Sequence, residues 1–322
     1  MMTGIGMKQQ EMNRVSRFWA VVRYELLWNL RKKKILVVLI AAAALEAISL
    51  SLTPMLLGII GQSVTQNPDY VVSTGMPGFI LFFFGMVVVM NSISGEFESG
   101  TIVPLLTKPV SRTTIFLGKL SAALLTLIPA YVLLFIIEVI GGTAVYGPQN
   151  DLYILPVTLV GLIVSTLVWM AIVLAIGSVT KSSVLAAIVS FAVYFGLLIG
   201  YSIISAFSGQ SWVLAYLPGT GNSGYLIPTA TSIPSIGSTS VSTGTDSIAS
   251  SLVSFILHPS FFVAFVKMGV STQGPVTTPV LTVLYTEPLS YVLLSSLSVA
   301  LVYIFVFLFI AWFALRQAQV AE

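Results

Sequence analysis

Cysteine is absent from the chain, and histidine occurs once, at His258. The absence of cysteine excludes disulfides, cysteine-ligated zinc, iron–sulfur clusters and thiol catalysis. A single histidine argues against a metal or haem site built from several histidines. Charge is also scarce, because only 8% of the residues are charged, whereas a soluble domain carries about 25%. So few charges cannot provide the solvated surface of a soluble protein of this length.

Long hydrophobic runs are present instead. Hydrophobic residues make up 57% of the chain, and the mean hydropathy is +1.00. An apolar run of more than about 18 residues can cross a hydrocarbon layer about 30 Å thick as a helix. Such runs predict six transmembrane helices, at residues 35–60, 70–93, 120–146, 152–179, 184–206 and 288–315. The sequence therefore predicts an all-α integral membrane protein embedded in the lipid bilayer.

The lead that precedes the first run, residues 1–34, predicts an amphipathic helix. Its apolar residues recur at intervals of three and four positions and therefore share one face: Val15, Phe18, Trp19, Val22, Leu26 and Leu30. The lead also contains three aromatic residues, Trp19, Tyr24 and Trp28. Such amphipathic rings suit the headgroup layer, where the polar part of the ring contacts water and headgroups and the rest contacts lipid chains. We expect a helix that lies in the membrane interface. The alternative is a helix that packs on a soluble partner.

Basic residues set the orientation. If the six runs cross the membrane, every lysine and arginine except Lys267 falls on one side. An excess of these residues marks the cytoplasmic face. We therefore expect a multi-pass protein of the cell membrane with its N- and C-termini in the cytoplasm.

The order of these segments predicts the division of the chain. We expect a cytoplasmic lead (1–34), five transmembrane helices (35–206), an extracellular loop (207–287), and a sixth helix with a short tail (288–322). The loop is rich in Ser, Thr and Gly and has few charges. Its apolar stretch at 248–270 predicts a re-entrant or surface hairpin, because a seventh span would place Arg316 outside.

The segment 94–119, between the second and third predicted spans, is too long for a plain turn. It begins with Glu96 and Glu98 and ends with Arg112 and Lys119. Apolar residues lie between these charges, at Ile102, Leu105 and Leu106. Exposed apolar residues with charged flanks favour docking to a soluble partner. The alternative is that these apolar residues pack beneath the helix bundle.

The same segment resembles the signature of ABC-2-type transporter permeases. That signature has an acidic pair, then Gly-Thr-Ile/Leu, a Leu-Leu pair, Pro-Val-Ser-Arg, and a lysine before the third span. The matching residues here are Glu96, Glu98, Gly100, Thr101, Ile102, Leu105, Leu106, Pro109, Val110, Ser111, Arg112 and Lys119. The short turn that contains Lys181, between the fourth and fifth spans, also fits the plan of the family.

The resemblance implies the membrane subunit of an ATP-driven exporter. Such a subunit pairs with itself or with a homologous permease, and it docks a separate cytoplasmic nucleotide-binding ATPase through the coupling segment 94–119. The ATP and Mg²⁺ would be bound by that partner, with no cofactor in this chain. The chain has no G-x-x-x-x-G-K-[ST] motif for holding phosphates, so we do not expect it to be an enzyme. No nucleic-acid partner is expected.

Two carboxylates, Glu46 and Glu138, fall inside predicted spans. A charge at the bilayer centre costs about 2.5–3.5 kcal/mol on insertion scales, so such residues usually face the bundle or a wet cavity. They are candidates for a polar lining of the substrate path. The alternative is a protonated carboxyl that is hydrogen-bonded to a neighbouring helix.

Two other functions remain open from the sequence. One is a non-transporting assembly or regulatory component with the same fold. The other is an ion-coupled carrier that works without an ATPase and uses Glu46 as its ion site.

Overall fold

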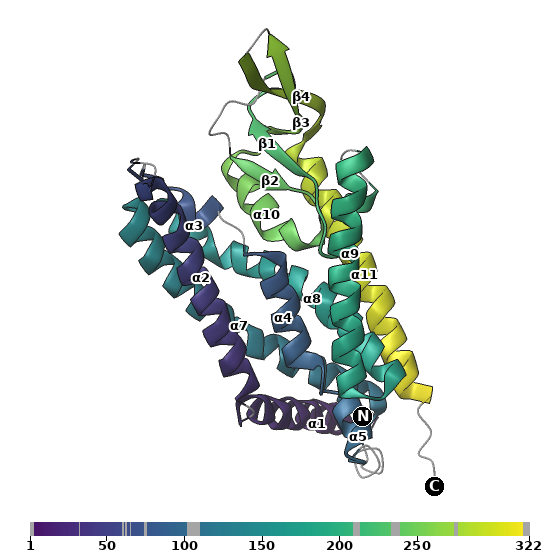
Figure 1. Ribbon diagram of the computed structural model, residues 1–322. Coiled ribbons are helices and arrows are strands. Elements are labelled where there is room, and N and C mark those ends of the chain that lie inside the picture. Colours follow the sequence, from purple (N-terminus) through teal and green to yellow (C-terminus); the bar gives the residue numbers. More distant parts are fainter. Residues whose placement is uncertain are drawn as a thin grey trace.

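The computed structural model describes residues 3–31, 33–59, 61, 63–64, 66–73, 76–101, 110–208, 213–232, 239–273 and 276–317. In these residues, six helical segments are long and apolar enough to cross a membrane, which confirms the predicted fold class. They contain α2 (Lys34–Ile59), α4 (Gly78–Val89), α7 (Arg112–Tyr146), α8 (Leu155–Thr180), α9 (Ser183–Ser208) and α11 (Leu289–Gln317). Figure 1 shows them side by side as a bundle.

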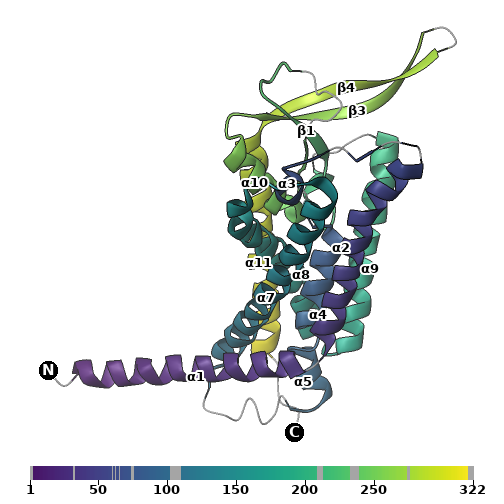
Figure 2. The same cartoon turned by 90° about the vertical axis from the view of Figure 1, so that its left-hand side faces the viewer.

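A long helix, α1 (Thr3–Arg31), lies across one end of this bundle. Figure 2 shows α1 roughly perpendicular to the other long helices and projecting beyond them. It packs against α7 and buries Val22, while Trp19 and Trp28 are exposed. Exposed aromatic rings along a helix of this orientation suit a membrane interface. We call this end of the bundle the α1 end.

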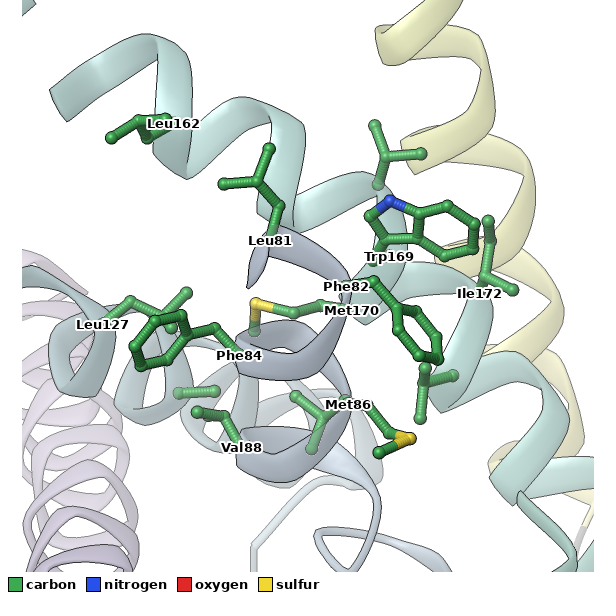
Figure 3. Packing of buried hydrophobic residues seen from close by; sticks show 14 of the residues in the cluster. Leu81, Phe82, Phe84, Met86, Val88, Leu127, Leu162, Trp169, Met170 and Ile172 are labelled. Atoms are coloured by element: carbon green, nitrogen blue, oxygen red, sulfur yellow. The ribbon is translucent and has the colours of Figure 1, made fainter. Parts of the chain in front are cut away.

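The core of the bundle lies between α4 and α8. Their most apolar stretches have 56% and 67% of residues buried, whereas those of α2, α9 and α11 have about one-fifth buried. Phe82 and Trp169 pack edge to face, with ring centroids 5.1 Å apart (Figure 3). A Cβ added at Gly85 would lie 3.2 Å from Cβ of Trp169, so glycine allows the two helices to approach closely. The outer helices present apolar side chains to their surroundings.

The second and third membrane segments differ in detail from the prediction. A short helix, α3 (Tyr70–Ser73), precedes α4, which begins directly after Pro77. Helix α7 begins at Arg112 and not near residue 120, because the Ser111 side chain accepts a hydrogen bond from the Thr114 N–H (3.1 Å) and caps the helix. Lys119 is therefore inside a membrane-length helix and not in a loop. The coupling segment contains only one short described helix before α7, α5 (Ser94–Glu98).

A small folded unit occupies the opposite end of the bundle, between α9 and α11. Its strands are β1 (Ser223–Ile227), β2 (Ser240–Ser242), β3 (Phe262–Gln273) and β4 (Val276–Pro288), in the antiparallel order β2-β1-β3-β4. Short helices flank them: η2 (Leu214–Tyr216), η3 (Thr245–Ser247) and α10 (Ile248–Leu257). A further short helix, η1 (Leu152–Ile154), joins α7 to α8 and packs on α10 through Ile154 and Val253. Figure 2 shows the β3–β4 hairpin extending beyond the bundle. We call this end the sheet end.

This sheet was not predicted, and the stretch 248–270 does not form one hairpin. Helix α10 ends at Leu257, and the backbone of His258 (φ −137°, ψ 65°) lies outside the helical region, which a following proline disfavours. The chain then enters β3, whose pairing partner is β4. The apolar side of the sheet packs on the start of α11 through Val263, Phe265 and Val292. The region 207–287 is therefore a folded α/β cap in its described parts.

Candidate functional site

The residues predicted to couple to a partner lie at the α1 end of the molecule. Glu96 and Glu98 are on α5, Arg112 and Lys119 are on the first turns of α7, and Lys181 joins α8 to α9. Gly100 and Thr101 follow α5 and are exposed. Four predicted residues lie outside the described part of the chain: Ile102, Leu105, Leu106 and Pro109.

A buried ion cluster joins three elements at this end. Lys119 Nζ on α7 donates to Glu25 Oε1 on α1 (2.5 Å) and to Glu96 Oε1 on α5 (2.6 Å). Lys119 is only 5% exposed and Glu25 is 7% exposed. Buried charges are tolerated when they are paired in this way. The cluster fixes α1 and α5 to the start of α7.

Glu25 was not predicted as a site residue. It lies on α1, and its partner is 94 positions away in the sequence. Its only sequence signal is that it interrupts an apolar and aromatic stretch with an acidic residue.

Glu98 joins α5 to the turn between α8 and α9. One carboxylate oxygen accepts hydrogen bonds from the Ser182 hydroxyl and from the backbone N–H of Ser183, both at 2.8 Å. Ser183 is the first residue of α9, where backbone N–H groups lack partners within the helix and the helix dipole favours a negative charge. The adjacent Lys181 has a left-handed backbone (φ 53°) and places Nζ 5.6 Å from the ring centroid of Phe97.

Arg112 joins the start of α7 to the end of α11. Its Nη1 donates to the carbonyl oxygens of Arg316 (2.5 Å) and Leu315 (3.4 Å). Carbonyl groups in the last turn of a helix lack partners within that helix, and a nearby cation is favourable there. The Trp312 Nε1–H also donates to the Thr113 hydroxyl (3.2 Å). Arg112 therefore holds two membrane-length helices together at the α1 end.

A cleft of about 860 Å³ opens beside the ion cluster, between α1, α5 and α7. Its walls include Trp28, Glu96 and Glu98. Thr101 and Val110 also border it, and these residues flank the undescribed stretch 102–109. The cleft is therefore bordered by described residues on both sides of that stretch.

Glu46 and Glu138 lie away from this site, on the neighbouring helices α2 and α7. They are 7% and 3% exposed, and their carboxyl groups are close enough to interact electrostatically. Within the described residues, neither makes an ion pair. No group of three or more His, Asp or Glu side chains in the described ranges could hold a metal ion. The two glutamates form a separate buried acidic pair.

Six membrane-length helices, a surface helix across one end and a folded cap at the other define a multi-pass membrane protein. The chain belongs to the ABC-2 family of transporters, because the family model described as "ABC-2 family transporter protein" matches residues 19–318. The match includes the C-terminal part of α1, from residue 19, together with the whole bundle and the cap. The protein is thus a membrane component of a transport system, a permease subunit, and is not itself catalytic. No curated protein matches the chain.

Proposed function

We propose that this chain is the membrane subunit of an ATP-driven exporter that docks a separate ATPase at its α1 end. The α1 end would face the cytoplasm of a cell-membrane protein, with both termini on that side. The distribution of basic residues supports this orientation, because Lys267 of β3 is at the sheet end whereas Arg112, Lys181 and Arg316 are at the α1 end. An excess of basic residues is typical of the cytoplasmic side.

The observation that carries the proposal is the network of polar contacts made by the coupling segment 94–119. Glu96 ties α5 to α7, Glu98 ties it to the start of α9, and Lys119 extends the first connection to α1. A force applied at residues 94–119 would therefore reach two membrane-length helices and the surface helix directly. Coupling between distant sites is carried by packed elements and by such polar networks.

The ATPase would be a different polypeptide. This chain lacks the phosphate-binding motif, so ATP and Mg²⁺ would bind to the partner, and no cofactor is assigned here. We also propose that the permease pairs with itself or with a homologous permease. Large apolar side chains on α9 are exposed, including Ile188, Ile199 and Ile203, and either lipid or a second subunit can cover them.

The docking role can be tested by charging the apolar residues of the coupling segment. In the variant Leu105→Glu/Leu106→Glu, we expect the ATPase that co-purifies with the wild-type protein from native membranes to be lost. The matched control is Leu284→Glu, which makes the same change at an exposed position of β4. An ATPase that stays bound to the double variant, at wild-type yield, would contradict the docking role.

Transport assays separate the three functions that the sequence leaves open. In sealed vesicles, an exporter requires ATP, an ion-coupled carrier requires an ion gradient, and an assembly component moves no substrate. We propose that Glu46 and Glu138 line the substrate path, because both are buried without an ion-pair partner in the described residues. Glu46→Gln should then lower the ATP-dependent transport rate, with Asp69→Asn as an exposed control, and an unchanged rate would contradict this role.

A further inference from the structure

A second cavity, of about 470 Å³, lies away from the α1 end. It is formed where the start of α4 and the middle of α9 face the segment between β2 and α10. Its size is within the range of about 300–1,000 Å³ that is usual for small-molecule pockets. The side chains that define its chemistry are Phe79, Phe83, Tyr194, Phe195 and Asp246.

The aromatic rings of this cavity are held in place by one another and by the core. Phe79 and Phe83 pack edge to face with centroids 6.4 Å apart, and Tyr194 and Phe195 do so at 5.2 Å. Tyr194 also stacks on Phe82 of the core at 4.5 Å; Figure 3 shows Phe82 beside Trp169. Two helices therefore supply a fixed aromatic wall.

Asp246 is the one carboxylate on this wall, and its observed hydrogen-bond donors are all neutral. Trp169 Nε1–H donates to Oδ1 (3.2 Å) and Oδ2 (3.3 Å), and the Thr245 hydroxyl donates to Oδ1 (3.1 Å). The backbone N–H of Gly219 is a further donor. A Cβ on Gly78 would lie 2.6 Å from Oδ2, so the start of α4 must be glycine for the carboxylate to lie there.

No cation faces Asp246 from the elements that pack around it. The helices α4, α8 and α10 contain no charged residue, and the only charged residue of α11 is Arg316, at its far end. Within the described residues, Asp246 makes no salt bridge. Its titratable neighbours are Tyr131 and Tyr194. Asp246 is half-buried, and a carboxylate that is partly withdrawn from water without a counter-ion is costly, so the site lacks a positive charge.

We propose that this cavity binds an organic cation, an ammonium group on an apolar body, with the charge beside Asp246 and the body against the aromatic rings. Aromatic faces attract cations through the ring quadrupole, and cages of such rings recognise quaternary ammonium groups. A metal ion such as Ca²⁺ would instead need about six oxygen ligands. The lining supplies one carboxylate, and its other oxygen-bearing side chains are those of Tyr194, Thr220, Ser242 and Ser247. The proposal goes beyond the exporter assignment and does not depend on an ATPase.

Equilibrium binding of tritiated benzyltrimethylammonium to the purified full-length protein in nanodiscs tests this site. Asp246→Asn keeps an oxygen acceptor for Trp169 but removes the charge, and we expect it to weaken binding about tenfold or more. Tyr194→Leu and Phe83→Leu should each weaken binding about three- to tenfold. The matched controls are Asp69→Asn and Phe305→Leu, both at exposed positions outside the cavity, and they should bind like the wild type.

Competition separates a site that selects positive charge from one that binds any apolar molecule. Choline should displace the probe, whereas 3,3-dimethyl-1-butanol, its neutral isostere, should not displace it at the same concentration. The proposal is overturned if both compounds compete equally, or if Tyr194→Leu and Phe83→Leu bind the probe like the wild type. It is also overturned if the wild type does not bind the probe above background. The two ring variants keep the test decisive if Asp246→Asn fails to fold.

Discussion

Charged side chains have different kinds of partner at the α1 end and at the aromatic cavity. At the α1 end, Lys119 lies between two carboxylates, and Glu98 satisfies the start of a helix. At the other cavity, Asp246 has only neutral donors among its observed partners. A charge that is fully paired within the chain contributes to fixing the elements that carry it. A charge that is left without a counter-ion can instead attract one from outside.

This contrast assigns a different role to each region. At the α1 end, ionic and capping contacts connect α1, α5, α7 and the turn before α9. We call these connected elements the junction. The aromatic cavity is built as a receptor, with fixed rings and one unpaired carboxylate. The following predictions test this contrast, beginning with the largest expected effect.

Removing the cation from the α1 end should cause the largest loss of stability. In Lys119→Met, Glu25 and Glu96 would be left as like charges without their shared partner, and breaking a buried pair costs about 3–5 kcal/mol. We expect a clearly lower Tm for the purified protein, measured by tryptophan fluorescence. Lys33→Met, at an exposed position, should melt like the wild type. An unchanged Tm in Lys119→Met would show that the cluster does not fix the junction.

Binding in the aromatic cavity should depend on pH because of Asp246. Withdrawal from water raises the pKa of Asp246 to about 6, so the carboxylate is charged at neutral pH and becomes neutral as the pH falls through that value. The affinity for benzyltrimethylammonium should therefore be highest above about pH 7 and should fall about tenfold by about pH 5. Tyrosine side chains ordinarily titrate at about pH 10, so the neighbouring tyrosines do not contribute in this range.

The pH profile has its own control in the chain. Asp246→Asn should show the same weak affinity at all these pH values, because no charge remains to titrate. A wild-type profile that stays flat would mean that the carboxylate does not contact the cation.

Removing a single helix cap should have a smaller effect. Ser111→Ala deletes the side-chain acceptor for the Thr114 N–H at the start of α7, and loss of such a cap costs about 1 kcal/mol. The Tm should fall slightly, and by much less than in Lys119→Met. Ser63→Ala, at an exposed position, is the matched control. A loss as large as that of Lys119→Met would mean that the cap, and not the ion cluster, controls the junction.

The membrane part of the fold could be predicted from the sequence because it depends on composition within short windows. Runs of apolar residues are local signals, and they predicted the six membrane-length helices. The second span was predicted to begin at residue 70, whereas α4 begins after Pro77. The start of α7 was missed because one cap residue, Ser111, outweighs the polar composition of the first turns. The sheet was missed because β1 and β2 are short and rich in Ser and Gly, and because β1 pairs with residues about forty positions away.

The candidate sites were harder to predict than the fold, because they depend on contacts between residues that are far apart in the sequence. The charged flanks of the coupling segment were predicted from sequence, but Glu25 was not, because its contact with Lys119 arises only from the crossing of α1 and α7. Asp246 lies in the predicted loop 207–287 and was not predicted as a site residue. Its hydrogen bond with Trp169 joins residues 77 positions apart. Contacts between distant segments decide which charges become functional, and spacing in the sequence does not encode them.

The smallest effect on stability is expected at Glu98, because this residue is exposed and its hydrogen bonds within the described residues are to the start of α9. Glu98→Gln removes the negative charge at the start of α9 while keeping an oxygen that can accept from Ser182 and Ser183. We expect faster hydrogen–deuterium exchange in the first turn of α9, with little change in Tm, because the charge contributes through the helix dipole only within that turn. Glu287→Gln, on β4 at the sheet end, is the matched control. If exchange at the start of α9 stays at the wild-type rate, then the negative charge of Glu98 does not stabilise that helix end, and α5 holds α9 only through the two hydrogen bonds.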